Sequence, residues 1–276
     1  KQANEGFPVY HHYQKLAGYR LKNLKRYPTS AKTFLDSEQN IPEVGYLIKQ
    51  PDLAWTLQQV ADRGYDGFYK GESARRLVAG IQAANGIWTL EDLANYNVVE
   101  RQPIEIEYKG HKIVSAPPPS SGGIAIAAML NILSQYEMSE LNNADKTHLI
   151  VEAMRRAYKD RAEFLGDPDF VEVPTKELIS LERAKEYAAS IDMNKATSSL
   201  SLKGPKNIQE GFHTTHLSVI DKEGNRVSAT LSINLPFGSA LTIANTGVVL
   251  NNEMDDFSAK PGEPNAYGLV GNAANA

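Results

Sequence analysis

Apolar residues recur at helical spacing through most of the first two thirds of the chain, and this pattern predicts a mainly helical region. The clearest stripes predict helices from Pro51 to Gly64, from Ala74 to just before Gly86, and from about 144 to 165. Shorter helices are expected after the capping-box pair Thr89 and Asp92, over 124–133, and over 181–191. The apolar face expected for the 144–165 helix consists of Ile150, Met154, Ala157, Tyr158, Ala162 and Leu165.

Period-two alternation predicts strands in two places. Residues 104–108 and 111–115 form a predicted hairpin with Lys109-Gly110 as its turn. Strands are also expected over 215–221, 227–234 and 247–250, and the second of these places Ser228, Thr230, Ser232 and Asn234 on one face. Helices followed by a sheet predict an α+β layered protein.

Between these regions, residues 195–213 are rich in Ser, Lys, Gly, Pro and Asn and have no sustained hydrophobic period. Such a composition predicts an exposed, mobile linker. The chain is therefore expected to divide into a mainly helical part, 1–213, and a β-rich part, 214–276.

Composition excludes several classes of function. The net charge is −4. A chain with this charge shows no sign of the basic surface that nucleic-acid binding needs. Cysteine is absent, so disulfides and thiolate metal sites are excluded. The longest apolar run, 124–130, is far shorter than the roughly 20 residues of a membrane span. We expect no membrane span, and the polar start of the chain shows no signal peptide.

Thr214 is the first candidate for chemistry because it lies where the predicted linker meets a strand. A threonine hydroxyl needs an adjacent base, and its own α-amino group, with an ordinary pKa of about 8, can serve once the preceding peptide bond is cut. The alternative is that Thr214 and Thr215 simply begin a β-strand, in which threonine is favoured.

Two further groups of polar residues follow. Ser232 and Asn234 can face Thr214 if their strand pairs with the one that begins there; otherwise they lie on a solvated sheet face. Three carboxylates follow a predicted buried strand: Glu253, Asp255 and Asp256. They can bind an ammonium group, or can form a solvated acidic turn or a calcium loop. Their spacing lacks the EF-hand pattern, so we expect no metal.

Several motifs, in order along the chain, resemble those of the γ-glutamyltranspeptidase family. They are residues 66–71 (DGFYKG), 117–124 (PPPSSGGI), 158–161 (YKDR) with 165–170 (LGDPDF), 214–221 (TTHLSVID) with 224–225 (GN), and 250–262 (LNNEMDDFSAKPG). The resemblance covers essentially the whole chain. It implies the αββα sandwich of the N-terminal nucleophile (Ntn) hydrolases, here incomplete at both ends, with 1–213 in the large-subunit region and 214–276 in the small-subunit region.

The resemblance also assigns roles. It implies that Thr214 is the nucleophile, released when it attacks the carbonyl of His213 and splits the precursor into two associated subunits. Ser232 stands where the family often has a threonine that hydrogen-bonds the nucleophile. Asn234, Glu253 and Asp256 match residues that hold the α-amino group of the glutamyl moiety.

The implied activity is γ-glutamyl hydrolysis or transfer, with glutathione or a related amide as donor and water or an amino acid as acceptor. No cofactor is implied, and the family suggests an extracellular or periplasmic location. Two alternatives remain: an acylase for glutaryl or cephalosporin-type amides, and an inactive truncated chain with a binding or structural role.

The chain departs from the family at its ends. It starts inside the large-subunit region, after the arginine that binds the substrate's α-carboxylate. It stops before the serine pair that also holds that carboxylate and before the glycine pair of the oxyanion hole. Because loss of one oxyanion donor costs roughly 10²–10³ in rate, we expect little turnover from these 276 residues alone. Because the sequence runs unbroken through His213 and Thr214, we also expect an uncleaved, precursor-like state.

Overall fold

A computed structural model of the chain describes residues 1–199, 201–202, 215–257 and 263. The chain divides into two compact units, each taken by itself below. Unit 1 is Lys1–Val98 with Phe212–Met254, and unit 2 is Val99–Gly211 with Asp255–Ala276. His213, Thr214, most of the predicted linker and the end of the 250–262 motif lie outside the described residues.

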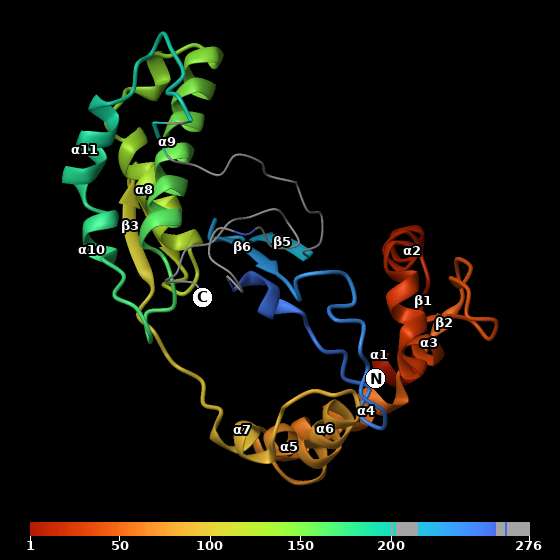
Figure 1. Ribbon diagram of the computed structural model, residues 1–276. Coiled ribbons are helices and arrows are strands. Elements are labelled where there is room, and N and C mark those ends of the chain that lie inside the picture. The colour runs from red at the N-terminus through yellow and green to blue at the C-terminus, as the bar shows by residue number, and fades with distance from the viewer. Residues whose placement is uncertain (200, 203–214, 258–262, 264–276) are drawn as a thin grey trace. The chain divides into compact units, whose positions relative to one another are not determined.

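Unit 1 combines short helices with two small strand pairs (Figure 1). Its N-terminal elements are α1 (Gln2–Glu5), β1 (Phe7–Pro8), α2 (His11–Arg26), α3 (Pro28–Phe34), β2 (Leu47–Ile48), α4 (Pro51–Arg63), α5 (Asp66–Tyr69), α6 (Gly71–Ala83) and α7 (Leu90–Asn95). The later segment adds β5 (Thr215–Ile220) and β6 (Arg226–Leu231), and the 3₁₀ helix η2 (Glu253–Asp256) crosses into unit 2.

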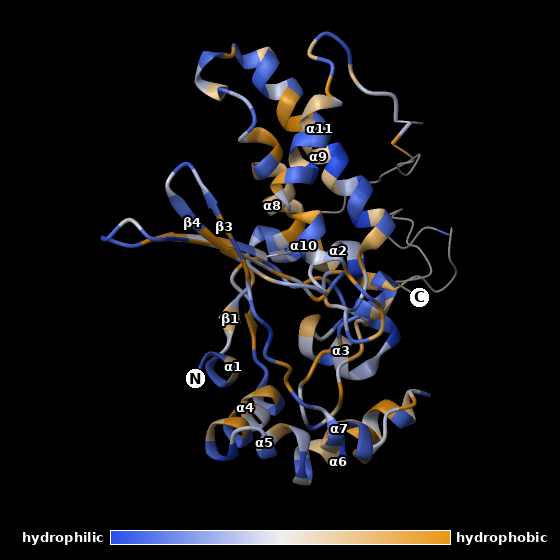
Figure 2. Cartoon of the chain, turned by 90° about the vertical axis from the view of Figure 1, so that its left-hand side faces the viewer, coloured by the Kyte–Doolittle hydropathy of each residue, from blue (hydrophilic) through white to orange (hydrophobic). Residues whose placement is uncertain are grey.

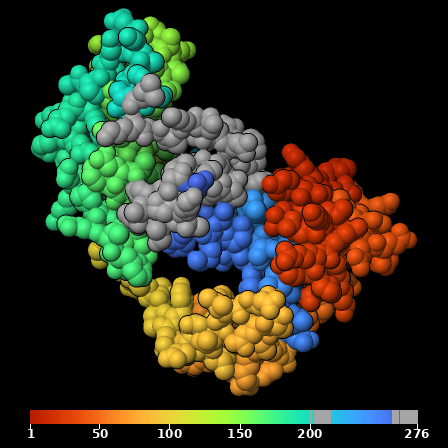
Figure 3. Space-filling model, in the orientation of Figure 1, coloured from red at the N-terminus to blue at the C-terminus, as the bar shows by residue number. Residues whose placement is uncertain are grey.

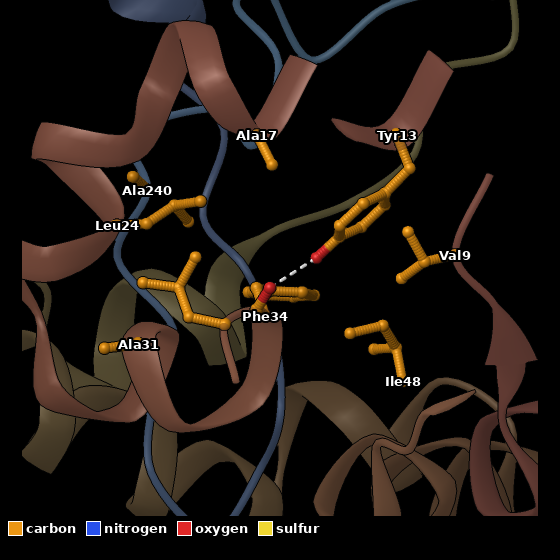
Figure 4. Close-up of a cluster of buried hydrophobic side chains, with 9 residues drawn as sticks. Val9, Tyr13, Ala17, Leu24, Ala31, Phe34, Ile48 and Ala240 are labelled. Atoms are coloured by element: carbon orange, nitrogen blue, oxygen red, sulfur yellow. Dashed lines mark hydrogen bonds between the residues drawn. The ribbon is translucent and has the colours of Figure 1, made fainter. Parts of the chain in front are cut away.

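Two apolar clusters hold unit 1 together, and both take residues from its two separate chain segments. The first surrounds Leu24 and Ile48 and includes Ala240 (Figure 4). Within it, the Tyr13 hydroxyl donates to the Phe34 carbonyl at 2.6 Å. The second cluster packs the inner face of α6 against Ile243. Burial of these side chains therefore joins residues that are about 200 positions apart in the sequence.

Unit 2 is a helical layer packed on a hairpin. Its elements are β3 (Ile104–Tyr108), β4 (His111–Ser115), α8 (Gly122–Leu133), η1 (Met138–Glu140), α9 (Asn143–Phe164), α10 (Thr175–Leu178) and α11 (Leu181–Ala189). Helix α8 is the centre of the unit, because it buries residues against both the hairpin and α9. Hydrophobic and hydrophilic stretches alternate along these helices in Figure 2.

Most of the predicted elements are confirmed at or near their predicted bounds. The hairpin pairs Ile104 with Ser115 and Tyr108 with His111, as expected. Thr89 caps α7 in a complete capping box with Asp92. Ser180 caps α11 by accepting the Arg183 N–H at 3.1 Å.

The predicted inward face of α9 is correct at Ala157, which is buried, and wrong at three other positions. Ile150, Met154 and Tyr158 are 42%, 42% and 52% exposed, whereas Leu149, Ala153 and the charged residues Glu152, Arg156 and Asp160 are buried. Small residues at positions 153 and 157 let α9 approach α8 closely, and partners from other segments stabilise the buried charges. A hydrophobicity pattern cannot register either effect.

Two strand predictions also need correction. Strand β6 ends at Leu231, so Ser232 and Asn234 lie beyond it, and Asn234 has a left-handed backbone with φ 66°. Residues 247–250 form no strand; Val249 makes an isolated bridge with Thr242 instead. The hairpin β5–β6 itself pairs Thr215 with Leu231 and Ile220 with Arg226.

We predict that Leu149→Ala lowers the free energy of unfolding by about 2–5 kcal/mol, because it leaves a cavity at a fully buried position. The neighbouring Ile150→Ala, on the exposed face, should cost less than about 1 kcal/mol. Urea unfolding followed by circular dichroism measures both. A larger loss for Ile150→Ala than for Leu149→Ala would contradict the observed face of α9.

Candidate functional site

The segment that follows β6 carries most of the described candidate residues. Immediately after Leu231, the Ser232 hydroxyl oxygen accepts the backbone N–H of Asn234 at 2.9 Å. This contact closes a tight turn and lets Asn234 adopt its left-handed conformation, which asparagine tolerates better than most residues. Asn234 is buried, with 3% of its surface exposed.

Asn252 connects this turn to the acidic end of the segment. Its backbone carbonyl accepts a hydrogen bond from the Asn234 side-chain amide at 2.9 Å, and its Oδ1 accepts the Leu235 N–H at 3.0 Å. Asn252 directly precedes Glu253, so these contacts place Ser232, Asn234 and Glu253 in one small region of unit 1. Asp256 is the last residue of the 3₁₀ helix η2, which begins at Glu253. It belongs to the later segment of unit 2.

The residues between these two points have an unusual backbone. Phe237 and Ala240 have φ values of 59° and 62°, and Asn245 has 60°. Each left-handed non-glycine residue costs roughly 1–2 kcal/mol. Such a backbone persists only where its surroundings fix it.

Side chains from the N-terminal helices provide that fixation. Ser30 Oγ on α3 lies 2.7 Å from both the Ala240 carbonyl oxygen and Thr242 Oγ1, and it accepts the Thr242 N–H at 2.9 Å. Arg20 on α2 donates to the Gly238 carbonyl at 2.8 Å. In Figure 3, atoms of the blue segment lie against the red N-terminal helices.

The other end of the segment is held in the same way. Thr56, the buried residue of α4, donates its hydroxyl proton to the Thr246 carbonyl at 2.7 Å. Asn245 receives a hydrogen bond from Arg76 at its carbonyl, at 3.0 Å, and donates its N–H to Asp52 at 3.2 Å. The segment over 238–246 is thus fixed at several backbone groups, and it can hold Asn234 and Glu253 in a reproducible arrangement.

The polar face of the β5–β6 hairpin has its own hydrogen-bond cluster. His216 Nδ1 lies 2.9 Å from Thr230 Oγ1, and its Nε2 lies 3.0 Å from Ser228 Oγ and 3.2 Å from Ser218 Oγ. All four side chains are exposed. Ser228 and Thr230 therefore surround His216, while Ser232 and Asn234, predicted on the same face, belong to the turn beyond the strand.

The chemical character of the site is that of hydrogen-bond acceptors. Amide and carboxylate oxygens suit a cationic ammonium group, which offers up to three N–H donors.

Within the described ranges, no cluster of His, Cys, Asp or Glu has the geometry of a metal site. Among the same residues, no helix is both long and apolar enough to cross a bilayer. The predicted nucleophile, Thr214, lies outside the described residues, as does His213.

Sequence reasoning missed the residues that support this site. Ser30, Thr56 and Arg20 are separated by about 190 to 218 positions from the carbonyls they bind. No local pattern marks them. Asn252 lies within the 250–262 motif, for which the sequence gave it no role. The asparagine pair 251–252, directly before the acidic residues, is the feature of the sequence that could have marked it.

We predict that Gly238→Ala destabilises the chain by about 3 kcal/mol or more, because a Cβ there would stand 2.3 Å from the Leu250 carbonyl oxygen. Gly224→Ala is the matched control: its φ is also positive, at 85°, but a Cβ would meet nothing within 4 Å. The control should cost only about 1–2 kcal/mol of backbone strain. Urea unfolding compares the two, and equal losses would contradict the close approach of 238 to 250.

Comparison with known proteins places this chain in a family. The chain matches the sequence model described as Gamma-glutamyltranspeptidase over residues 1–276. It is 47% identical to a glutathione hydrolase proenzyme of Escherichia coli (strain K12), covering 84% of this chain and 40% of that protein. It is 38% identical to the acylase ACY 1 proenzyme of Pseudomonas sp. (strain SE83), covering 94% of this chain and 46% of that protein.

Solved structures give the same result. The γ-glutamyltranspeptidase of Helicobacter pylori matches with a TM-score of 0.70 at 36% identity, over 72% of this chain and 58% of that one. A cephalosporin acylase from Bacillus halodurans matches with a TM-score of 0.75 at 28% identity, over 97% of this chain and 48% of that one. The predicted α+β class and Ntn hydrolase fold are confirmed.

The chain spans less than half the length of the two curated relatives. The match nevertheless extends from its first residue to its last, across the motifs around Ser232, Asn234 and Glu253. The chain belongs to the γ-glutamyltranspeptidase family.

Proposed function

We propose that the protein carrying these residues is a γ-glutamyl hydrolase and transferase that acts on glutathione and related γ-glutamyl amides. The observation that carries the proposal is the family match over the whole chain, with a glutathione hydrolase proenzyme at 47% identity. Position 214 is the proposed boundary between a large-subunit region, 1–213, and a small-subunit region, 214–276.

Thr214 is the proposed nucleophile and Ser232 its proposed hydroxyl partner, because both stand in motifs that the family match covers. Strands β5 and β6 pair antiparallel, with Thr215 opposite Leu231 and His216 opposite Thr230. Thr214 directly precedes β5 in the sequence, and Ser232 directly follows β6.

Self-cleavage is the first proposed step. The Thr214 oxygen attacks the His213 carbonyl carbon, the C–N bond between the two residues breaks, and the nitrogen takes up the hydroxyl proton. Water then hydrolyses the resulting ester, which leaves a carboxyl group on His213 and a free amine and hydroxyl on Thr214. The attack is intramolecular, so proximity supplies much of the rate.

Turnover uses the same hydroxyl. The new α-amino group accepts the hydroxyl proton while the Thr214 oxygen attacks the γ-carbonyl of the donor. The donor's C–N bond breaks, and its amine leaves with a proton. Water or the amine of an amino acid then attacks the γ-glutamyl ester, which regenerates Thr214 and releases glutamate or a new γ-glutamyl amide.

Asn234, Glu253 and Asp256 are proposed to bind the α-ammonium group of the donor. An amide oxygen and carboxylates accept hydrogen bonds from an ammonium group, and the carboxylates also offset its charge. The contacts of Asn252 with Asn234 and Leu235 hold Asn234 beside the start of the acidic turn.

We expect Thr214→Ala to abolish self-cleavage and to lower turnover by at least about 10³-fold, because it removes the attacking oxygen. Thr215→Ala is the control, since it removes a neighbouring hydroxyl and leaves the proposed nucleophile. Intact mass and N-terminal sequencing report cleavage, and hydrolysis of a chromogenic γ-glutamyl anilide reports turnover. A protein that remains uncut and inactive before any substitution would instead support a binding or structural role.

An acylase for glutaryl or cephalosporin-type amides is the second candidate. The 38% identity to an acylase proenzyme and the TM-score of 0.75 with a cephalosporin acylase favour it. The two functions differ at the ammonium group, which a glutaryl substrate lacks. Glu253 and Asp256 favour the γ-glutamyl substrate because they offer negative charge at that position.

We predict that Glu253→Gln raises the KM for a γ-glutamyl anilide by about tenfold, the loss expected for one charge-assisted hydrogen bond. The same change should leave the KM for a glutaryl anilide within about twofold, because that substrate has no ammonium group. Asp221→Asn, at the exposed hairpin turn, is the control and should alter neither. Equal effects on both substrates would contradict an ammonium contact at Glu253.

A further inference from the structure

The outward face of helix α2 carries a dense group of positive charges (Figure 1). This basic face consists of Lys15, Lys22, Lys25 and Arg26, which are all exposed and which the proposed reaction does not use. The whole stretch 6–35 contains six Lys or Arg residues and no Asp or Glu. The net charge of −4 for the chain conceals this local excess of the opposite sign.

Helix α2 is held with its basic face toward solvent. Its opposite face buries Tyr13, Ala17 and Leu24 in the first apolar cluster of unit 1. Gln14 Nε2 also donates to the Pro42 carbonyl at 3.0 Å. Because these contacts fix the rotation of the helix about its own axis, the four basic side chains stay on the surface of unit 1.

The spacing of the charges places most of them on one line along the helix. Lys15, Tyr19, Lys22 and Arg26 stand at i, i+4, i+7 and i+11, which share one side of an α-helix. With a rise of 1.5 Å per residue, this line is about 16 Å long. Lys25 flanks it, so the charges form an elongated surface and not a pocket.

No carboxylate balances the basic face. Among the residues that the structure describes, none of its four charges lies within 4.0 Å of an Asp or Glu oxygen. Helix α6 differs, because its Glu72 pairs with both Arg75 and Arg76. Like charges three or four positions apart on a helix repel each other, and an anionic partner would relieve that repulsion on α2.

The helix dipole explains only part of the charge. Cations in the last turn of a helix are favourable, and this accounts for Lys25 and Arg26. Lys15 and Lys22 lie before the last turn, where the effect has fallen off. Solubility does not explain them either, because a surface that only keeps a protein in solution carries charges of both signs.

The composition of the line favours a lipid surface over a single shaped anion. Tyr19 stands between Lys15 and Lys22 and is 62% exposed. A tyrosine side chain has an apolar body and a polar tip, and it is enriched where lipid meets water. Lysine is a point charge on a flexible stem, whereas arginine is the planar fork that reads the geometry of one carboxylate or phosphate. Three of the four basic residues are lysines.

We propose that the basic face of α2 binds the surface of an anionic lipid bilayer, with Tyr19 at the level of the headgroups. The contact is peripheral, and no residue of the proposed reaction takes part in it. A basic residue close to such a surface strengthens binding by about fivefold, so the four together contribute about 10²–10³-fold.

Co-sedimentation of the full-length protein with lipid vesicles tests the proposal. Vesicles of phosphatidylglycerol and phosphatidylcholine in equal parts should bind the protein, and vesicles of phosphatidylcholine alone should not. The triple variant Lys15→Gln, Lys22→Gln, Lys25→Gln should partition into the anionic vesicles about 10²-fold less. Added salt should weaken binding of the parent protein, because it shortens the range of the attraction.

Two control variants separate the position of the charge from its amount. The triple variant Lys176→Gln, Lys185→Gln, Lys222→Gln removes the same charge from other exposed sites and should bind like the parent. The double variant Lys15→Arg, Lys22→Arg keeps the charge of the basic face and should also bind like the parent. Circular dichroism checks that each variant keeps the helix content of the parent.

The outcomes decide the proposal without reference to enzymatic activity. Selective loss of binding in the α2 glutamine variant supports it. Equal binding to both kinds of vesicle, or equal losses in the two glutamine variants, overturns it. Loss of binding in the arginine variant also overturns it, because a diffuse surface does not distinguish the two cations. Tighter binding to duplex DNA than to anionic vesicles assigns the basic face to a nucleic acid and overturns the lipid surface.

Discussion

The arrangement of unit 1 depends on buried backbone carbonyls that must find donors. The segment over 238–246 cannot satisfy its own groups in a regular ladder, because its left-handed residues interrupt strand geometry. Ser30, Thr56 and Arg20 supply the missing partners from helices at the start of the chain. An unsatisfied buried carbonyl would cost about 1–3 kcal/mol, so these contacts and the segment's conformation require each other.

In unit 2, buried charged side chains also need hydrogen-bond partners. Glu152, Arg156 and Asp160 occupy positions on α9 that apolar residues could fill. Glu152 and Arg156 pair with each other, and further partners come from α11 and from the segment after it. A buried ion pair adds little net stability compared with apolar packing, but loss of one partner is severe. In this unit, Thr197 contacts both the Glu152 carboxylate and the Arg156 guanidinium group.

The fold alone does not choose between γ-glutamyl transfer and amide acylase chemistry, because relatives named for each share it. In the proposed function, the side chains that distinguish the two substrates are Asn234, Glu253 and Asp256. Asn234 reaches its place through the Ser232 turn and Asn252, and Glu253 follows directly. Under the proposed function, substrate preference depends on how firmly this left-handed segment is fixed by helices remote in sequence.

Elements whose hydrogen bonds are local could be predicted from the amino-acid sequence. The hairpin with its Lys109-Gly110 turn, the capping box at Thr89 and the cap at Ser180 follow from contacts within a few residues, so pattern was sufficient. The motifs around 214 and 250 also identified the family.

Tertiary structure alone decided which face of α9 is buried, because charged residues can lie inside only when distant partners exist. Tertiary contacts also explain why residues 247–250 form a single bridge in place of the expected strand. They likewise fix the left-handed backbone conformation of Asn234. Each of these features depends on contacts between residues far apart in the chain, which local hydrophobic periodicity does not encode.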